Sequence, residues 1–346
     1  MSTSAGSDDR PLRWAIVGIG RHTRRFIGPA IAQSRLGVVA AVCSSRPDEA
    51  AEVSRDWGQP TVYTSYDDLL ACPGVDALFL VSPNNLHSGQ VAAAAAAGKH
   101  VLCEKPLANT PADCRQMVEA CAKAGVKLGV GFHLRHNIVH ERAREIVASG
   151  QLGEIKFVSA RYAHATGGSA PAGPPPAWRR DPEQAGGGSF IGTGVHAIDL
   201  LRYVTGAEVA AVTVAADDNG IRYGEQNLLA SAKLSNGANA SIHGGNLPYP
   251  ANELVISGTA GTVRCTGSVG NYGGGLLELI TADGERAQDV ERHNVYVREC
   301  DDFVARVRAG QEPNASGTDG LRCAEVTAAI YASARTGALT SIPAPG

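Results

Sequence analysis

The chain has 346 residues, a length that exceeds most single hydrophobic cores and predicts two domains. Apolar residues make up 44% of the sequence and charged residues 19%, as in ordinary globular proteins. The formal net charge of −3, without a dense basic stripe, argues against nucleic acid as a partner, and no apolar stretch is long enough to span a bilayer.

The N-terminal segment and the cysteines bear on the cellular compartment. The segment MSTSAGSDDR is polar and acidic, and it lacks the basic and apolar regions of a signal peptide. The eight cysteines include no C-x-x-C pair and lie mostly in apolar surroundings, so we expect no zinc or other metal site. These features predict a cytoplasmic protein with free thiols and no membrane attachment.

In roughly the first 130 residues, apolar runs alternate with helical patterns. Strands are predicted at residues 13–20, 38–44, 76–82, 100–104 and 126–132, and helices at 23–34, 46–57, 86–98 and 110–125. Repeated βα units with fully apolar strands are typical of a parallel sheet that is covered on both faces.

The pattern changes after Phe132. Helices are predicted at 138–150, 195–206 and 319–337, and alternating strands at 151–165, 209–217, 226–235, 238–245, 252–267 and 276–284. Turns such as SNG, TAG and ADG join consecutive strands, which indicates an antiparallel sheet. We therefore predict an α/β domain at 11–132 and an α+β domain at 133–346, whose sheet has one open face suited to a homo-oligomer.

The first predicted strand ends in glycines that are typical of a dinucleotide site. Gly18 and Gly20 would allow a tight turn and close approach of a pyrophosphate to the backbone, and the next helix would start beside it. Thr23 stands where the fingerprint has its third glycine, so a plain tight turn is the alternative. The position after the first strand of a βα series favours the dinucleotide interpretation.

The end of the second predicted strand bears on the choice of cofactor. An acid there would bind the ribose 2′-hydroxyl of NAD, but the strand ends in Ser44, Ser45 and Arg46. Hydroxyls and a guanidinium suit a 2′-phosphate, so we predict that NADP(H) is favoured over NAD(H). The alternative is that Arg46 is a solvated loop residue.

Several motifs resemble the Gfo/Idh/MocA family of sugar and inositol oxidoreductases. They are SPNNLH at 82–87, EKPLANT at 104–110, GGGSFIGTGVHAIDLL at 186–201 and the tail AAIYASARTGALTSI. The resemblance covers nearly the whole chain after Leu12, and the E-K-P tripeptide is its most specific part. It implies a Rossmann domain that binds NAD(P), followed by a substrate-binding and oligomerisation domain.

The resemblance implies that Lys105 and His196 are catalytic. Lys105 would lie beside the nicotinamide and the substrate hydroxyl, with Glu104 holding it, and Pro106 would favour an extended backbone at the lysine. A lysine beside a cationic ring should have a lowered pKa, which suits proton exchange with an alcohol. A surface lysine and a buried, satisfied histidine are the alternatives.

The family's usual acid four residues before the histidine is replaced here by Gly192. Its absence leaves open a different proton relay, a substrate that needs less room or a lost activity. Asp199, one helical turn after His196, either orients the imidazole or acts structurally.

The resemblance also implies further contacts. Cofactor contacts are expected at Gly18, Gly20, Arg21, Ser44, Ser45, Arg46, Ser82, Pro83, Asn84, His87, Glu104, Lys105 and His133. Substrate contacts are expected at Arg135, Trp178, Arg179, Thr193 and His196, where Trp178 could stack on a pyranose and Arg179 could bind hydroxyls or a carboxylate. The alternative for the loop of Trp178 is a lid that does not touch substrate.

We therefore expect an NAD(P)-dependent oxidoreductase that transfers hydride to or from a secondary alcohol or ketone of a sugar, cyclitol or glycoside. The alternatives are a cofactor-dependent glycosidase on the same scaffold and a non-enzymatic dinucleotide-binding regulator. A homodimer or homotetramer with a small sugar or polyol substrate is expected.

Overall fold

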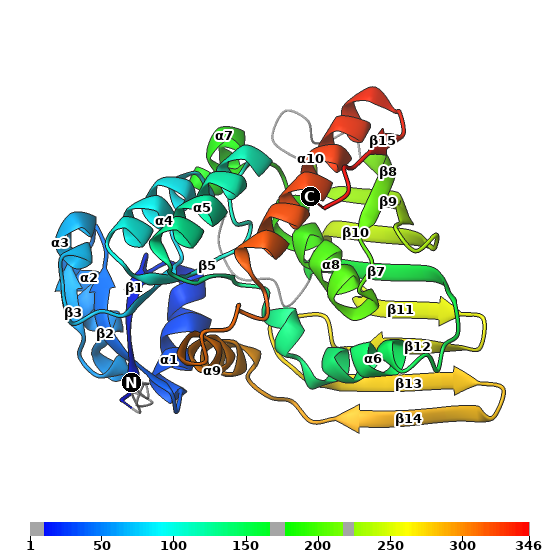
Figure 1. The fold of residues 1–346 in the computed structure, drawn as a ribbon, viewed down its shortest axis with the longest axis horizontal. Helices are drawn as coiled ribbons and strands as arrows, with labels where there is room; N and C mark the ends of the chain where they lie inside the picture. The colour runs from blue at the N-terminus through cyan, green and yellow to red at the C-terminus, as the bar shows by residue number, and fades with distance from the viewer. Residues whose placement is uncertain (1–9, 167–176, 217–224, 346) are drawn as a thin grey trace, which may run out of the picture.

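The computed structural model describes residues 10–166, 177–216 and 225–345. It contains a parallel sheet and a larger mixed sheet, with helices packed against both (Figure 1). The predicted combination of a Rossmann-like parallel sheet with a mainly antiparallel second sheet is confirmed.

The first sheet has six parallel strands in the order β3-β2-β1-β4-β5-β6. The strands are β1 (Leu12–Val17), β2 (Gly37–Cys43), β3 (Thr61–Tyr63), β4 (Ala77–Leu80), β5 (His100–Cys103) and β6 (Leu128–Val130). The strand order reverses between β1 and β4, and ligands of open α/β sheets bind outside the carboxyl ends of the strands at such a point.

The helices that follow these strands include those predicted from the sequence. They are η1 (Thr23–Ile27, a π-helix), α1 (Gly28–Gln33), α2 (Pro47–Val53), η2 (Arg55–Trp57), α3 (Tyr66–Leu70), η3 (Asn84–Leu86), α4 (His87–Ala96) and α5 (Pro111–Ala124). In α5 the Thr110 side chain accepts a hydrogen bond from the Asp113 N–H, and the helix ends at Gly125 in the left-handed conformation. The short β3 and α3 were not predicted.

One helix that packs on the first sheet comes from far along the chain. Helix α9 (Val295–Arg308) was not predicted, although Asn294 caps it, and it packs against α1 and β2 (Figure 1). Its Phe303 ring lies 5.2 Å from the ring of Trp14 in β1. Helix α9 thus belongs to the predicted second domain by sequence but packs on the sheet of the first. The division into domains at 11–132 and 133–346 stays a prediction.

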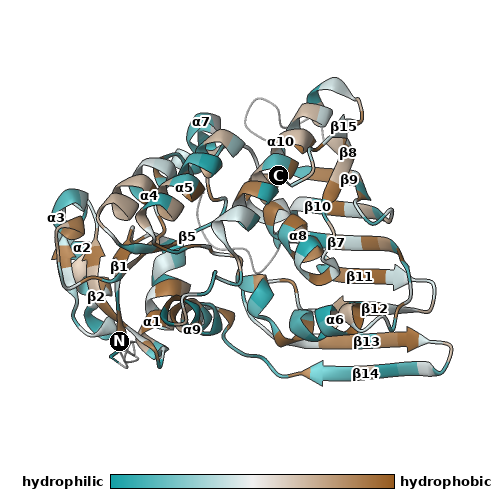
Figure 2. Ribbon diagram, viewed as in Figure 1, coloured by the Kyte–Doolittle hydropathy of each residue, from teal (hydrophilic) through white to brown (hydrophobic). Residues whose placement is uncertain are grey.

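The second sheet has nine strands in the order β14-β13-β12-β11-β7-β10-β9-β8-β15. They are β7 (Ile155–Ala165), β8 (Val209–Ala216), β9 (Asn227–Leu234), β10 (Asn239–Leu247), β11 (Glu253–Gly258), β12 (Gly261–Thr266), β13 (Gly275–Thr281), β14 (Gly284–Val290) and β15 (Thr340–Ser341). Neighbours are antiparallel except β7 and β10, which are parallel. Strand β14 was missed because its side chains are mostly exposed and its residues are mostly hydrophilic, as the colours of Figure 2 show at this edge.

Three helices pack on one face of this sheet, namely α6 (Ile138–Ala148), α8 (Phe190–Thr205) and α10 (Gly317–Thr336). Helix α8 approaches the sheet closely, since a Cβ added at Gly244 of β10 would lie 2.6 Å from the Cα of Gly194. Helix α10 also packs on α5 and joins the two halves of the molecule. Three short helices complete the described chain: η4 (His133–His136), η5 (Ala177–Arg180) and α7 (Pro182–Ala185).

The opposite face of the second sheet carries exposed apolar side chains. Phe157 in β7 and Leu229 in β9 are each 43% exposed, and the strand register places both on the face turned away from α8. Within the described ranges, no helix is long and apolar enough to cross a membrane.

Candidate active site

The E-K-P tripeptide lies directly after β5, at the carboxyl edge of the first sheet. Glu104 is buried, and its carboxylate contacts Nε2 of His22 at 3.1 Å and accepts the Lys105 N–H at 3.2 Å. The Lys105 ammonium points across to the other half of the molecule, where Nζ donates to the carbonyl of Gly192 at 3.0 Å. Lys105 therefore connects the end of β5 to the first turn of α8.

The environment of Lys105 shifts its pKa. Burial lowers the pKa to about 8, and the nearby Arg179 cation acts in the same direction while Glu104 opposes it. Burial also disfavours ionised Glu104, but the neighbouring His22 and Lys105 outweigh it and hold the pKa of Glu104 at about 2. The pair thus combines a permanent carboxylate with an amine that can exchange its proton near neutral pH.

His196 lies on α8 in an aromatic setting. Its ring centroid is 4.7 Å from that of His133, 5.6 Å from Tyr162 and 6.0 Å from Phe132. Burial, reinforced by Lys105, lowers the pKa of His196 well below its usual value, so the imidazole is neutral at physiological pH. Its buried Nδ1 has no hydrogen-bond partner among the described residues.

His133, expected at the cofactor, lies beside His196. Its Nε2 contacts the Gly270 carbonyl at 3.0 Å, and its ring stacks on that of Tyr296 at 4.8 Å. Burial lowers the pKa of His133 to about 3, so this imidazole is neutral as well.

Arg135 does not face this cluster, and its contact with substrate stays a prediction. Its Nε and Nη2 donate to the two carboxylate oxygens of Asp199 at 2.9 and 2.6 Å, and Nη2 is also 3.0 Å from Asp319. Asp199 therefore holds an arginine, which favours its structural alternative over orientation of His196. Buried charges require such partners, which short-range sequence patterns do not reveal.

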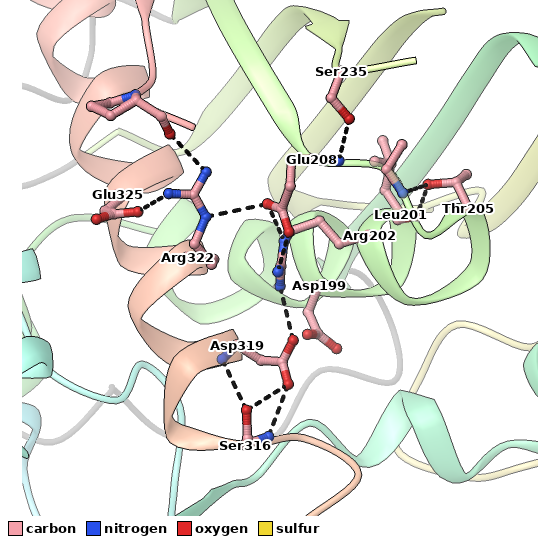
Figure 3. A network of polar contacts seen from close by, with 12 residues as sticks. Asp199, Leu201, Arg202, Thr205, Glu208, Ser235, Ser316, Asp319, Arg322 and Glu325 are labelled. Atoms are coloured by element: carbon pink, nitrogen blue, oxygen red, sulfur yellow. Dashed lines mark hydrogen bonds and ion pairs between the residues drawn. The ribbon is translucent and has the colours of Figure 1, made fainter. Parts of the chain in front are cut away.

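The Arg135–Asp199 pair belongs to a larger network between α8 and α10. Arg202 donates to Asp319 and Glu208, and Arg322 contacts Glu208 and Glu325 (Figure 3). The network fixes α8, and with it His196, against α10.

Two other predicted contact residues are buried with their polar atoms engaged. The Thr193 hydroxyl donates to the Ser189 carbonyl and accepts the Gly245 N–H at 2.8 Å, so it ties α8 to β10, and its contact with substrate stays a prediction. His87 is fully buried, and its ring nitrogens contact the carbonyls of Ser82 and Pro106 at 3.1 Å each. His87 thus braces the loops after β4 and β5, and its contact with the cofactor stays a prediction.

The turn after β1 fits a dinucleotide. Gly18 has a φ of 95°, and a Cβ there would lie 2.9 Å from the Val81 carbonyl oxygen, so only glycine suits this position. A Cβ at Gly20 would meet nothing within 4 Å, which leaves this backbone open to a ligand. Thr23, at the third fingerprint position, donates its hydroxyl to the Gly18 carbonyl at 2.8 Å and closes the turn. Arg21 is exposed beside it.

The end of β2 carries the predicted 2′-phosphate residues together with an acid that sequence reasoning missed. The Ser44 hydroxyl accepts the Arg46 N–H at 3.1 Å, and Ser45 is exposed. Arg46 pairs with Glu49 of α2 at 2.5 Å, and Arg24 of η1 pairs with the same carboxylate. Glu49 lies only three residues after Arg46, but the sequence does not show that two arginines share it.

The loop after β4 carries Ser82, Pro83 and Asn84, which were predicted to contact the cofactor, and it lies at the same carboxyl edge of the sheet. Pro83 is half-buried, and the Ser82 hydroxyl donates to the Gln90 side chain at 2.5 Å. The buried Asn84 amide donates to the Ala185 carbonyl at 2.8 Å. Asn84 thereby connects this loop to the segment that carries Trp178 and Arg179.

Arg179 on η5 lies near the first turn of α8. A Cβ added at Gly192 would be 3.8 Å from Nη1 of Arg179, and the guanidinium carbon of Arg179 is 5.1 Å from the ring centroid of Trp178. The structure thus brings Arg179 to the same glycine whose carbonyl holds Lys105.

Sequence reasoning missed three aromatic side chains of this cluster. They are His22, His164 and Tyr296. The ring of Tyr296 on α9 lies 5.4 Å from that of His22. Desolvation, together with the Lys105 and Arg179 cations, lowers the pKa of His164 to about 4. The position of His22 two residues after Gly20 was a usable signal, because the fingerprint places it at the cofactor turn. His164 and Tyr296 lie on elements that the topology alone brings here.

Comparison with known proteins agrees with this arrangement. The model for the oxidoreductase family with an NAD-binding Rossmann fold matches residues 12–132, and the Gfo/Idh/MocA C-terminal domain model matches residues 140–264. The chain belongs to the Gfo/Idh/MocA oxidoreductase family. It is therefore an enzyme of the dehydrogenase and reductase class acting on CH–OH groups, which disfavours the regulator alternative.

Named family members are similar over nearly their full length. The chain is 30% identical to 1,5-anhydro-D-fructose reductase of Ensifer adhaerens, covering 95% of this chain and 98% of that one. It is 29% identical to an NADP(+) D-xylose 1-dehydrogenase of Haloferax volcanii, covering 96% and 100%. The crystal structure of aldose-aldose oxidoreductase from Caulobacter crescentus superposes with a TM-score of 0.87 at 30% identity, covering 96% and 100%. These names give the glycosidase alternative no support.

Proposed function

We propose that this Gfo/Idh/MocA protein oxidises a secondary alcohol, or reduces the corresponding ketone, of a sugar or cyclitol with NAD(P). The observation that supports this function most directly is the position of Lys105 at the carboxyl edge of the Rossmann sheet. Its ammonium lies 3.0 Å from the Gly192 carbonyl and near the neutral His196. The sugar substrates named for the relatives support the substrate class.

The residues divide the proton chemistry between them. When bound, the nicotinamide supplies the hydride acceptor or donor. Lys105 in its neutral form takes the proton of the substrate hydroxyl, and in the reverse direction its ammonium returns it. Glu104 positions Lys105 through its backbone N–H and stabilises the ammonium. His196 would offer a neutral imidazole beside the same hydroxyl. The turn at Gly18 and Gly20 would hold the pyrophosphate.

A panel of sugars and cyclitols with both cofactors tests this function through the absorbance of the reduced nicotinamide. We expect net reduction of cofactor with at least one member of the panel. Cofactor binding without turnover of any member in either direction would contradict the proposal.

We propose that NADP(H) binds more tightly than NAD(H), because Ser44, Ser45 and Arg46 suit a 2′-phosphate. Ser44→Asp should shift the preference toward NAD(H), because a carboxylate accepts from the 2′-hydroxyl and repels the phosphate. Calorimetric titration of both cofactors measures this. Equal or tighter binding of NAD(H) to the wild type would refute the preference.

Glu49 provides a second test of the same preference. Its carboxylate pairs with Arg46 and Arg24 and competes with a phosphate for both guanidinium groups. Glu49→Gln should therefore tighten NADP(H) binding by about tenfold and leave NAD(H) binding nearly unchanged. Equal effects on the two cofactors would show that these arginines do not meet the 2′-phosphate.

We propose a homo-oligomer, a dimer or a tetramer, formed through the open face of the nine-stranded sheet. Phe157 and Leu229 on that face are each 43% exposed. The double variant Phe157→Lys, Leu229→Lys should dissociate the assembly, because it places like charges in a buried contact. Sedimentation at micromolar concentration measures the mass. A monomeric wild type would contradict the interface.

We also propose a cytoplasmic location, which the free cysteines support: all eight are unpaired, and seven of them are buried.

A further inference from the structure

Glu104 and Lys105 are neighbours in the chain and carry opposite charges, but their side chains do not pair. The Lys105 ammonium donates to the Gly192 carbonyl at 3.0 Å, and no ion pair joins it to the Glu104 carboxylate in the described part of the chain. A carboxylate in contact with an amine favours the ammonium form and raises the pKa of the amine. The separation of the two groups therefore bears directly on proton exchange at Lys105.

The contacts of Glu104 show what holds its carboxylate. Oε2 accepts the Lys105 N–H at 3.2 Å, and Oε1 lies 3.1 Å from Nε2 of His22. With a pKa of about 2, Glu104 is ionised and can only accept, so Nε2 of His22 carries the hydrogen and donates it. Among the residues that the structure describes, His22 is the one side chain that donates to this carboxylate.

His22 is itself held by aromatic neighbours. Its ring lies 5.2 Å from that of Phe26 in η1 and 5.4 Å from that of Tyr296 in α9, and the second contact is edge-on. The side chain is one-third exposed, at the turn after β1 that fits a dinucleotide. An aromatic ring without a donor can occupy the same place, so the hydrogen bond to Glu104 can be removed while the packing is kept.

The other titratable groups around the pair leave Glu104 as the available counter-ion of Lys105. They are Cys103 of β5, His87 of α4, His133 of η4, His164 of β7, Arg179 of η5, His196 of α8, and Tyr296, Glu299 and Cys300 of α9. Burial lowers the pKa of these histidines and raises the pKa of the cysteines, the tyrosine and Glu299, so it favours their uncharged forms. Arg179 is a cation, and it adds to burial in lowering the pKa of Lys105.

We propose that His22 is a positioning residue that binds the Glu104 carboxylate and keeps it from pairing with the Lys105 amine. The proposal rests on the function proposed above and concerns proton transfer at the same site. With Oε1 held by His22, Glu104 acts on Lys105 through its backbone N–H and through its charge at a distance. Because His22 belongs to the turn after β1, it also connects the dinucleotide site to the proton-transfer site.

His22→Phe tests the proposal, because it removes the donor and keeps a ring beside Phe26 and Tyr296. The freed carboxylate should pair with the Lys105 ammonium, since a buried carboxylate that loses a partner is stabilised by a neighbouring cation. The midpoint of the pH dependence of kcat/KM for alcohol oxidation, about 8 in the wild type, should rise by about one pH unit or more. The variant should therefore be about tenfold slower near neutral pH and should approach the wild-type rate at strongly alkaline pH.

Two further variants separate the hydrogen bond from the charge. His22→Gln should keep the wild-type midpoint, because the glutamine side-chain amide can donate from about the position of Nε2. Glu104→Gln should lower the midpoint, because the charge of Glu104 opposes the effect of burial on the pKa of Lys105.

His100→Phe is the matched control. His100 is also half-buried, and it lies at the amino end of β5, the strand whose other end leads into Glu104 and Lys105. Its Nδ1 accepts the Lys127 N–H at 3.0 Å, so the substitution likewise removes one hydrogen bond of a histidine ring. The midpoint for Lys105 should stay unchanged.

The reactivity of the Lys105 amine gives a readout that does not need turnover. Lys105 is partly accessible, and only its neutral form reacts with an acylating reagent. Trace labelling with acetic anhydride over a range of pH, followed by mass spectrometry, measures the neutral fraction, and the exposed Lys123 is the internal reference. His22→Phe should raise the labelling midpoint of Lys105 by about one pH unit or more, and His22→Gln should not.

Three outcomes would overturn the inference. A His22→Phe enzyme that is slower at every pH with an unshifted midpoint would make His22 structural. Equal midpoints for His22→Phe and His22→Gln would exclude the hydrogen bond to Glu104 as the cause. A change confined to the dissociation constant of NAD(P)H, measured by calorimetry, would assign His22 to the cofactor. The expected labelling shifts in a protein that turns over no sugar or cyclitol would contradict the proposed function and still support this inference.

Discussion

Lys105→Met is expected to lower turnover by about a hundredfold or more while fold and cofactor affinity stay close to wild type. The variant removes the amine that reaches the Gly192 carbonyl at 3.0 Å, and methionine keeps most of the aliphatic stem. Lys123→Met, at an exposed position on α5, is the matched control and should retain wild-type rates.

The pH profile gives the same prediction a second readout. Oxidation of an alcohol needs Lys105 as the neutral base, and its pKa of about 8 places the transition slightly above neutral pH. kcat/KM for oxidation should therefore rise with pH and level off above about 8, and Lys105→Met should remove this rise.

The His196→Ala variant should also be slow. If both groups serve one proton path, the double variant should lose less turnover than the product of the two single fold losses. A Lys105→Met enzyme with the wild-type rate would end the catalytic interpretation.

Asp199→Ala is expected to cost about 3–5 kcal/mol of the free energy of unfolding. Asp199 is fully buried, and its carboxylate accepts two hydrogen bonds from Arg135 at 2.9 and 2.6 Å. The substitution leaves the buried guanidinium with Asp319 as its remaining carboxylate partner. Denaturant titration followed by circular dichroism measures the loss.

A surface ion pair supplies the control for this prediction. Asp302 pairs with Arg306 one turn away on α9, and both side chains are about one-third exposed. Asp302→Ala should cost no more than about 1 kcal/mol. Equal losses for Asp199→Ala and Asp302→Ala would show that the buried pairing of Asp199 with Arg135 does not stabilise the fold as described.

The local patterns were sufficient for most elements near the cofactor. The βα alternation predicted the parallel sheet, and G-I-G and E-K-P fell at strand ends because parallel strands place their carboxyl termini on one edge. Helix α5 could be predicted with its cap, since Thr110, Pro111 and Gly125 act within a few residues of each other. The family resemblance then indicated the oxidoreductase class.

The contacts that the sequence did not reveal have a different physical origin. Arg135, Thr193 and His87 belong to residue types that often contact ligands, but here their polar groups are taken by Asp199, by backbone of β10 and by neighbouring loops. Burial selects such partners, and the partners come from distant parts of the chain. No short-range pattern predicts them.

The sequence by itself determined the fold class, the glycine turn and the positions of Lys105 and His196, because propensity, periodicity and motif spacing act over a few residues. The tertiary structure alone decided that α9 covers the first sheet, that Glu49 lies between Arg24 and Arg46, and that Arg179 and Lys105 meet at Gly192. These pairings depend on how strands and helices far apart in the chain pack together. Charge and burial, which control the chemistry of the candidate site, follow from that packing.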